Sequence, residues 1–269
     1  MGMRINTNQA AINAQRQLLG TSHNEAQGLE RLATGLRINR AGDDAAGLAI
    51  AERFRTQVRQ LDQEARNLQY GVNAARTAEG GLQTQQEGVG RLRELALEAS
   101  NGTLTNEQRN AINEEAQQII EEIDNVGRQT EFNGLNLLNG DAQNVPLGNE
   151  DGEELTINES TAASLGMSSV DLSTQEGASQ AVETLDTAAA RISQNRATVG
   201  AQERRLESAI QQREITAQNA REAESRIRDL DIARQTIEQA RNNILEQTGI
   251  AALAQSNLQG ETAARLLGT

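Results

Sequence analysis

The stretch LATGLRINRAGDDAAGLAIAERF, residues 32–54, separates two different helical patterns. Two glycines and an asparagine interrupt the helical periodicity, because these residue types favour turns over helix interiors. Two adjacent aspartates then mark a new helix start, since a carboxylate oxygen caps free N–H groups and is favoured at the positive helix end. The interruption and the restart predict a joint of five residues: Gly35, Asn39, Gly42, Asp43 and Asp44.

Before the joint, residues 1–36 carry one apolar anchor in each heptad, and Leu29 and Leu36 fill the second core row only late. These anchors are Ile5, Ile12, Leu19, Ala26 and Ala33. A fully buried anchor contributes at most about 1.5 to 3 kcal/mol, whereas ordering costs about 1.5 kcal/mol per residue. We therefore expect this N-terminal arm to be disordered or frayed until another surface packs on it.

The last segment, residues 231–269, has the same character. Its sparse stripe is Ile237, Ala240, Ile244, Ala251 and Leu258. Both arms are expected to leave the same end of the molecule and to pair, with a counterpart of the joint near residues 228–231.

Between the arms, three segments have dense 4-3 apolar spacing, which is typical of coiled-coil helices. The first seam is Phe54, Val58, Leu61, Ala65, Leu68, Val72 and Ala75, continued by Leu82, Val89 and Ala96. The second and third seams are Ile112, Ala116, Ile119, Ile123 and Val126, and then Val182, Leu185, Ala189, Ile192, Val199, Leu206, Ile210, Ala217, Ala220 and Ile227. Polar residues such as Arg196 and Arg213 share the third seam, where they usually specify register and partner.

The helical period disappears from residue 133 to about residue 177. The segments VPLG and ELTIN flank Asp151-Gly152, which predicts a β-hairpin. The Ser/Thr-rich run of residues 160–179 is interpreted as a solvated loop, with helix returning at about Gln180. The prediction is a mainly α protein: a long coiled-coil-like three-helix rod with a short β-hairpin region and paired helical terminal arms. Its predicted divisions are residues 1–43, 44–130, 131–180, 181–230 and 231–269.

The composition argues against several classes of partner and of functional site. The 25 basic residues, all Arg, face 38 acidic residues, and the net charge of −13 argues against nucleic acids and anionic membranes as partners. No apolar run approaches the roughly 18 residues needed to cross a bilayer, and the N-terminus does not resemble a cleaved signal peptide. With no Cys and one His, His23, interpreted as a surface residue, the chain offers no catalytic constellation, cofactor site or metal site. A structural protein is favoured over an enzyme.

The absence of Lys has two interpretations. One is biased genome composition, and the other is adaptation to high salt.

Several blocks resemble bacterial flagellin. They are the stretch at residues 32–54, RLRELALEASNG, IDNVGRQTEFNGLNLL and ESRIRDLDIARQTIEQARNNILEQTGIAALAQSNLQ. With only about 45 residues joining the two helical regions, the chain resembles a minimal flagellin that lacks the variable outer domains. The resemblance implies a structural subunit that self-assembles into the extracellular flagellar filament for swimming motility.

The resemblance also implies roles for the parts of the chain. Residues 1–43 and 231–269 would form the inner tube of the filament, the rod the outer tube, and the joint a spoke between them. The inner-tube packing residues would be Ile5, Ile12, Leu19, Ile237, Ile244 and Leu258. Implied partners are other copies of the chain, an export chaperone, and the cap and hook-junction proteins, with export unfolded through the flagellar type III apparatus.

A receptor patch is implied as well. In the family, an Arg, a Leu and a Glu are recognised by the animal Toll-like receptor for flagellin, and they match Arg91, Leu95 and Glu115. The alternative is that these three residues serve subunit packing alone.

Two other functions remain open at this point. A hook–filament junction protein shares the terminal arms, and an exported coiled-coil adaptor or effector would form small closed oligomers.

Overall fold

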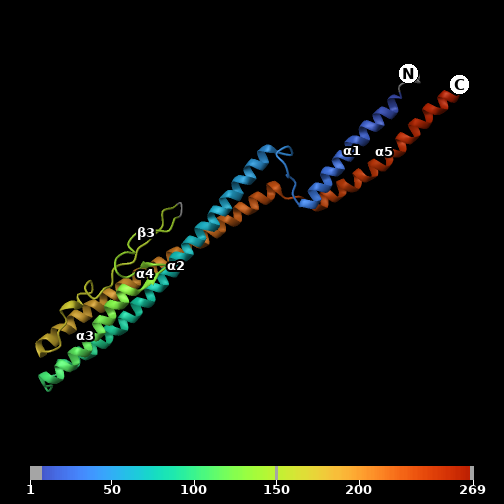
Figure 1. Cartoon of the computed structure of the whole chain (residues 1–269). Coiled ribbons are helices and arrows are strands. Elements are labelled where there is room, and N and C mark those ends of the chain that lie inside the picture. The colour runs from blue at the N-terminus through green and yellow to red at the C-terminus, as the bar shows by residue number, and fades with distance from the viewer. Residues whose placement is uncertain (1–7, 149–150, 267–269) are drawn as a thin grey trace. The chain divides into compact units, whose positions relative to one another are not determined.

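A computed structural model describes residues 8–148 and 151–266 of the 269-residue chain. The described part is mainly helical with two short antiparallel strand pairs (Figure 1). The helices are α1 (Gln9–Thr34), α2 (Ala45–Ala99), α3 (Asn106–Gln129), α4 (Gln175–Arg228) and α5 (Ile232–Leu266), with a 3-10 turn at Met167–Ser169. The strands are β1 (Glu131–Phe132), β2 (Leu135–Asn136), β3 (Val145–Pro146) and β4 (Glu154–Leu155).

The chain forms two compact units, and α2 and α4 each contribute to both. The arm unit comprises residues 1–58 and 218–269, and the core unit comprises residues 59–217. The arm unit thus holds the two predicted arms together with the first turns of α2 and the last turns of α4.

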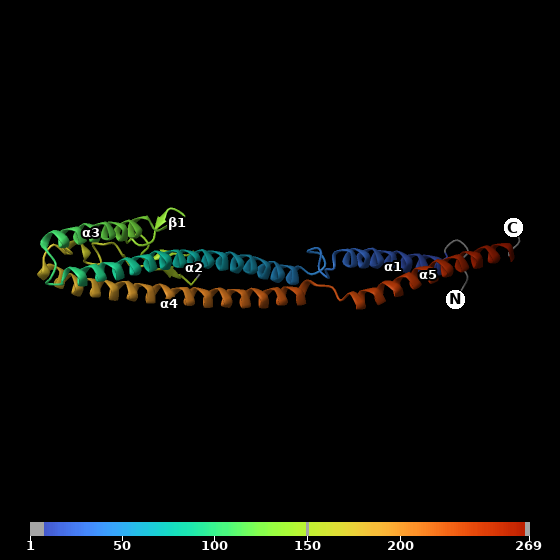
Figure 2. The same cartoon turned by 90° about the horizontal axis from the view of Figure 1, so that it is seen from below.

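In the arm unit, α1 and α5 lie side by side and antiparallel (Figures 1 and 2). The Asn8 side chain caps α1 by accepting a hydrogen bond from the Ala11 N–H at 3.2 Å. Gly35 ends the helix in a left-handed conformation with φ of 70°, which a glycine adopts without steric cost. Both arms are therefore helical where they pack on each other.

In the core unit, α2, α3 and α4 lie side by side and bury a continuous apolar core (Figure 2). The predicted first seam is buried through its centre, from Leu68 to Ala96. Helix α3 starts with a capping box, in which Thr105 and Gln108 exchange side-chain and backbone hydrogen bonds. Of the predicted second seam, Ala116 and Ile123 are buried, and Ile112 and Ile119 pack half-buried against the core. Helix α3 also buries Ile120 and Gly127, which the seam did not include.

The wider buried face of α3 is explained by a segment after β4 that covers this helix. Gly127 lies so close to the Ser160 carbonyl oxygen that a Cβ at this position would be 2.6 Å from it. Gln85 is fully buried and donates to that same oxygen at 2.6 Å, while the Ser160 hydroxyl donates to Gln85 Oε1 at 2.6 Å. The interpretation of residues 160–179 as a solvated loop is therefore wrong, because this segment buries Ser160, Leu165, Met167 and Leu172. Helix α4 also starts earlier than predicted, at Gln175.

The hairpin prediction is confirmed. Val145 pairs with Leu155 and Pro146 with Glu154, and Asp151-Gly152 lies in the connecting turn, of which residues 149–150 are outside the described part. A second pair, β1 with β2, closes around Asn133 and Gly134, whose φ values of 53° and 81° suit a tight hairpin turn.

Candidate assembly surfaces

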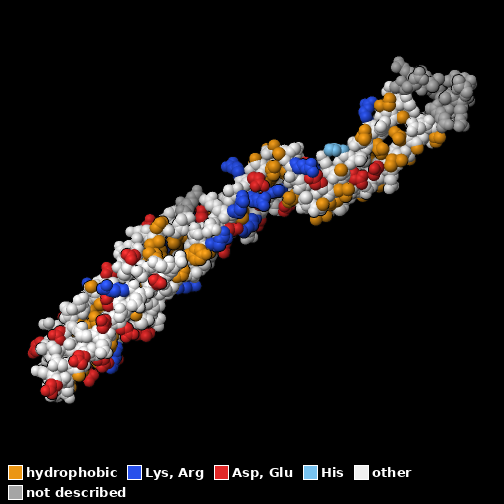
Figure 3. All heavy atoms as spheres, in the orientation of Figure 1, with side chains coloured by type: hydrophobic (Ala, Val, Ile, Leu, Met, Phe, Trp, Pro, Cys, Tyr) orange, Lys and Arg blue, Asp and Glu red, His pale blue; other side chains and the backbone are white. Residues whose placement is uncertain are grey.

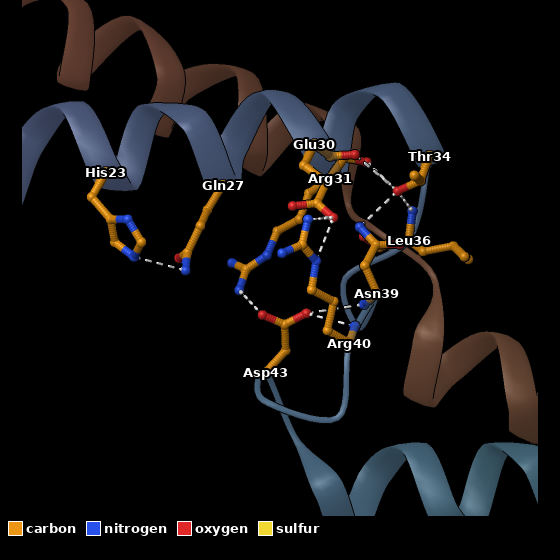
Figure 4. Close-up of polar contacts among 9 residues, drawn as sticks. All are labelled: His23, Gln27, Glu30, Arg31, Thr34, Leu36, Asn39, Arg40 and Asp43. Atoms are coloured by element: carbon orange, nitrogen blue, oxygen red, sulfur yellow. Dashed lines mark hydrogen bonds and ion pairs between the residues drawn. The ribbon is translucent and has the colours of Figure 1, made fainter.

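The joint is an ordered loop organised by one carboxylate (Figure 4). Asp43 Oδ2 accepts hydrogen bonds from the backbone N–H groups of Arg40 at 3.0 Å and Asn39 at 3.1 Å. The Arg31 guanidinium lies 3.8 Å from the other oxygen. Because these donors favour the charged form, with the Arg40 and Asn39 bonds first, the pKa of Asp43 is lowered.

The loop is also tied back to the last turn of α1. The Asn39 amide donates to the Thr34 hydroxyl at 2.9 Å, and Arg40 lies 2.9 Å from Glu30 (Figure 4). His23 is exposed and hydrogen-bonded to Gln27 at 3.1 Å, in keeping with a surface position. Side chains of the arm therefore fix the conformation of the joint.

The other joint residues have separate tasks. Asp44 caps α2 by accepting from the Gly47 N–H at 2.8 Å. Gly35 occupies the left-handed region, whereas Gly42 has no positive φ and a Cβ there would meet nothing within 4 Å. Of the two glycines, only Gly35 has a conformation that requires one.

A second chain segment crosses at the joint. Leu36 forms a two-residue antiparallel bridge with Asp229, between the end of α4 and the start of α5. Arg37 N–H donates to the Arg228 carbonyl at 2.7 Å, and Leu230 N–H donates to the Gly35 carbonyl at 3.0 Å. The connection from the arms to the longer helices is therefore two-stranded inside the arm unit.

The arms pair through a polar seam. Thr21, Gly28, Gln235 and Ser256 are buried between α1 and α5. Asn8 donates to the Ser256 carbonyl at 2.9 Å, and Gln239 donates to Glu25 at 3.2 Å. Polar and small side chains, which contribute little apolar burial, thus form much of this contact, with Leu18 packed beside Gly249.

The predicted apolar stripes lie outside that seam. The exposed fractions are 39% for Ile12, 64% for Leu19, 71% for Ile237, 61% for Ile244 and 54% for Leu258, and Ile5 lies outside the described residues. Ile12 and Leu19 instead line a hollow of about 440 Å³ with Leu18 and Leu253. Orange side chains mark this apolar surface on the arms in Figure 3. The stripes are therefore accessible to another molecule.

The proposed receptor patch is only partly at the surface. Arg91 and Glu115 are both exposed and form an ion pair of 2.9 Å between α2 and α3. Leu95 is only 1% exposed and belongs to the apolar core, so the expectation of a three-residue surface patch is corrected for this residue. Leu95 lies one helical turn after Arg91 on the same side of α2, where its shorter side chain is covered by the core while the long Arg side chain reaches solvent.

A polar cluster in the core unit was not assigned a role from sequence. Arg213 on α4 lies 2.9 Å from Glu64 on α2 and 2.5 Å from Asp151 of the hairpin loop, with side-chain exposure of only 12%. These carboxylates, with the Asp151 bond first, raise the pKa of Arg213. Arg213, a charged residue at a position of the third seam, was the sequence feature that indicated this cluster. The sequence did not show which carboxylates would surround it.

Two negative findings apply to residues 8–148 and 151–266. No three His, Cys, Asp or Glu side chains there gather in a way that could hold a metal ion. No helix in that part is long and apolar enough to span a bilayer.

Together these features define a class of protein: a helical subunit with a conventional core and a pair of arms that expose their apolar stripes. The model of the bacterial flagellin N-terminal helical region matches residues 5–143, and that of the bacterial flagellin C-terminal helical region matches residues 182–267. The chain belongs to the bacterial flagellin family, which is a structural protein family.

Relatives and solved structures agree with this assignment. The chain is 40% identical to flagellin of Halalkalibacterium halodurans over 98% of its own length and all of the relative, and 35% identical to flagellin of Bacillus subtilis with the same coverage. Bacillus cereus flagellin is a similar solved structure, with a TM-score of 0.50, 28% identity, and 55% of this chain and 88% of that chain covered. A putative flagellar hook-associated protein from Vibrio parahaemolyticus, at 14% identity and a TM-score of 0.56 over 69% of this chain and 99% of that chain, shares the fold.

Proposed function

We propose that the chain is the structural subunit of a bacterial flagellar filament, which it builds by self-assembly outside the cell. The observation that carries this proposal is the exposure of the apolar arm stripes beside a polar intramolecular seam. Isolated exposed apolar residues are common, but ten large ones among the described residues of one unit favour burial against other molecules. A structural role is inferred in place of an enzymatic one.

Within this proposal, residues 1–43 and 231–269 form the inner layer of the filament and the joint connects them to the outer rod. Ile12, Leu19, Ile237, Ile244 and Leu258 would then be buried between copies, as Ile5 is also expected to be. Fully burying such a side chain contributes about 1.5 to 3 kcal/mol, so a few per copy suffice to hold a polymer.

Electron microscopy of the purified chain after seeding tests the proposal. Wild-type chain should form long fibres, whereas small closed oligomers would support an exported adaptor and contradict a filament subunit. Ile237→Ser with Ile244→Ser should abolish fibres without unfolding the monomer. The matched control is Ile215→Ser, which alters an isoleucine of 55% exposure in the core unit and should leave fibre formation intact.

Curated relatives that cover the whole chain are named as flagellins and flagellar filament core proteins, which favours the filament over the hook–filament junction. The abundance of the chain in sheared filaments would decide between the two. Export without a cleaved signal peptide, through the flagellar type III apparatus with a chaperone and assembly under the cap, is part of the proposal. Secretion that persists in cells lacking that apparatus would contradict it.

Recognition of the free monomer by the animal Toll-like receptor is proposed for Arg91 and Glu115. The ion pair holds both side chains at one exposed site between α2 and α3. Arg91→Ala or Glu115→Ala should lower receptor signalling by monomer, with Arg128→Ala, which alters an exposed arginine on α3, as the control. Unchanged signalling would leave subunit packing as the role of this pair.

A further inference from the structure

Charge is divided unevenly along this chain. Residues 77–202 hold 21 of the 38 carboxylates but only 6 of the 25 arginines. Residues 1–76 and 203–269 hold the other 19 arginines and 17 carboxylates. One part of the molecule is therefore strongly acidic, while the rest is close to neutral with local basic stretches.

One acidic stretch within this part lies on α3. Residues 114–124 contain five carboxylates and no arginine. Two of the five are paired, Glu115 with Arg91 and Asp124 with Arg128. Glu114, Glu121 and Glu122 are exposed, and none of them has an ion-pair partner among the described residues.

This acidic face is also hollowed. A depression of about 480 Å³ is lined by Glu121, Glu122 and neighbouring polar side chains, among them Gln118 and Asn125. Carboxylates and amide oxygens are hydrogen-bond acceptors, and a guanidinium presents five donors in a planar fork. The depression thus has the chemistry to receive an arginine side chain.

The complementary stretch is on α2. Residues 53–59 contain three arginines and no carboxylate. Arg53 and Arg55 are exposed; Arg53 has no ion pair among the described residues, and Arg55 has only a 3.6 Å contact with Glu52 one turn away.

A subunit of net charge −13 must overcome repulsion from its own copies on assembly, so opposite local charges should meet. We propose that the acidic face of α3, centred on Glu121 and Glu122, docks on the basic stretch of α2, centred on Arg53 and Arg55, of a second copy. The two surfaces differ, so the contact is heterologous and leaves one free surface of each kind for the next copy, as an open polymer requires. This inference rests on the proposed self-assembly and names the surfaces that meet.

The proposed contact can be tested with two charge-reversed variants, assayed separately and as a mixture. Variant A carries Glu121→Arg and Glu122→Arg, and variant B carries Arg53→Glu and Arg55→Glu. Each variant alone opposes like charges at the contact, and we expect its critical concentration for seeded fibre growth to rise at least about tenfold. An equimolar mixture of A and B pairs opposite charges at every contact and should return the critical concentration to near the wild-type value.

Matched controls distinguish the loss of this contact from the effect of a changed net charge. Glu98→Arg with Glu183→Arg repeats the charge change of A at other exposed sites, and Arg204→Glu with Arg205→Glu repeats that of B. Equal helicity by circular dichroism shows that A and B remain folded. Growth of A and B at the wild-type critical concentration, or a mixture no better than its parts, would overturn the inference. Absence of fibres from wild-type chain would instead contradict the proposed function itself.

Discussion

The arm unit and the core unit use the same kind of long helix but treat their apolar side chains in opposite ways. Among the described residues, the core unit has 33 buried apolar residues and exposes only Tyr70, Leu97 and Ile215 among the large ones. The arm unit has four buried, Ile38, Ala51, Val58 and Ala220, and exposes ten large ones. The core unit therefore buries its apolar side chains within one chain, while the arm unit leaves most of its large apolar side chains exposed.

The joint lies inside the arm unit but is not built like the arms. It is held by backbone bridges, a capped helix start and one carboxylate, with Ile38 buried at 2% exposure. Ordered geometry at the joint therefore coexists with weak burial in the arms.

The largest effect is expected for a cavity in the core unit. Leu82 is 0% exposed, so Leu82→Ala should lower the free energy of unfolding by about 2 to 5 kcal/mol. Leu97→Ala, on the same helix at 48% exposure, is the control and should change it by less than about 0.5 kcal/mol. Urea denaturation followed by circular dichroism measures both, and equal losses would contradict the burial difference.

A smaller effect is expected at the buried ion cluster. Arg213→Gln leaves Glu64, which is 5% exposed, without its cation, and should cost about 1 to 3 kcal/mol. It should also loosen the hairpin, seen as faster hydrogen exchange at the Leu147 amide, which donates to Glu153. The exposed Arg204→Gln is the control; hairpin exchange that is equally slow in both variants would show that Arg213 does not hold it.

Substitution of one joint glycine should destabilise the joint, and substitution of the other should not. Gly35→Ala places a side chain in the left-handed region and should destabilise the joint by about 1 to 2 kcal/mol. Gly42→Ala meets open space and should be close to neutral. Exchange of the Arg37 and Leu230 amides, which bridge the two chain segments, measures the effect, and a Gly42 variant as perturbed as the Gly35 variant would contradict it.

In a filament, the Gly35 variant tests whether the conformation of the joint also sets filament shape. Gly35→Ala should change filament waveform before it abolishes assembly. Wild-type waveform and swimming in that variant would argue against such a role.

The smallest effect concerns pH. The lowered pKa of Asp43 means that its bonds to Arg40 and Asn39 stabilise the joint above the ordinary value of 3.8 and are lost as the pH falls through the lowered value. Protection of the Arg40 and Asn39 amides should therefore persist down to the ordinary Asp range and fall only below it. Asp43→Asn should remove this dependence, and loss of protection well above pH 4 in the wild type would contradict it.

Periodicity predicted the helices well because their buried faces repeat every three or four residues. It did not predict that α3 also buries Ile120 and Gly127, because the covering segment with Ser160 is distant in sequence. That segment was interpreted as a solvated loop because its Ser and Thr side chains looked polar. Gln85, from a helix 75 residues earlier, satisfies the Ser160 hydroxyl and carbonyl and makes its burial possible.

For the candidate surfaces, the sequence identified the joint residues but did not show what each of them does in the structure. Gly35 and Gly42 look alike in sequence, and only their backbone angles distinguish them. Leu95 matched a motif expected at the surface, yet it is buried in the core although it lies only four positions after an exposed arginine.

By itself the sequence determined the mainly helical fold, the places where helices stop, and the membership of the flagellin family, because these follow from local propensity and residue pattern. Only the tertiary structure decided which faces meet: the polar seam between α1 and α5, the bridge of Leu36 to Asp229, and the outward direction of the arm stripes. A helix with a sparse stripe has several faces of similar hydrophobicity. The face that becomes buried is therefore set by the partner it meets, and a partner distant in sequence leaves no local signal.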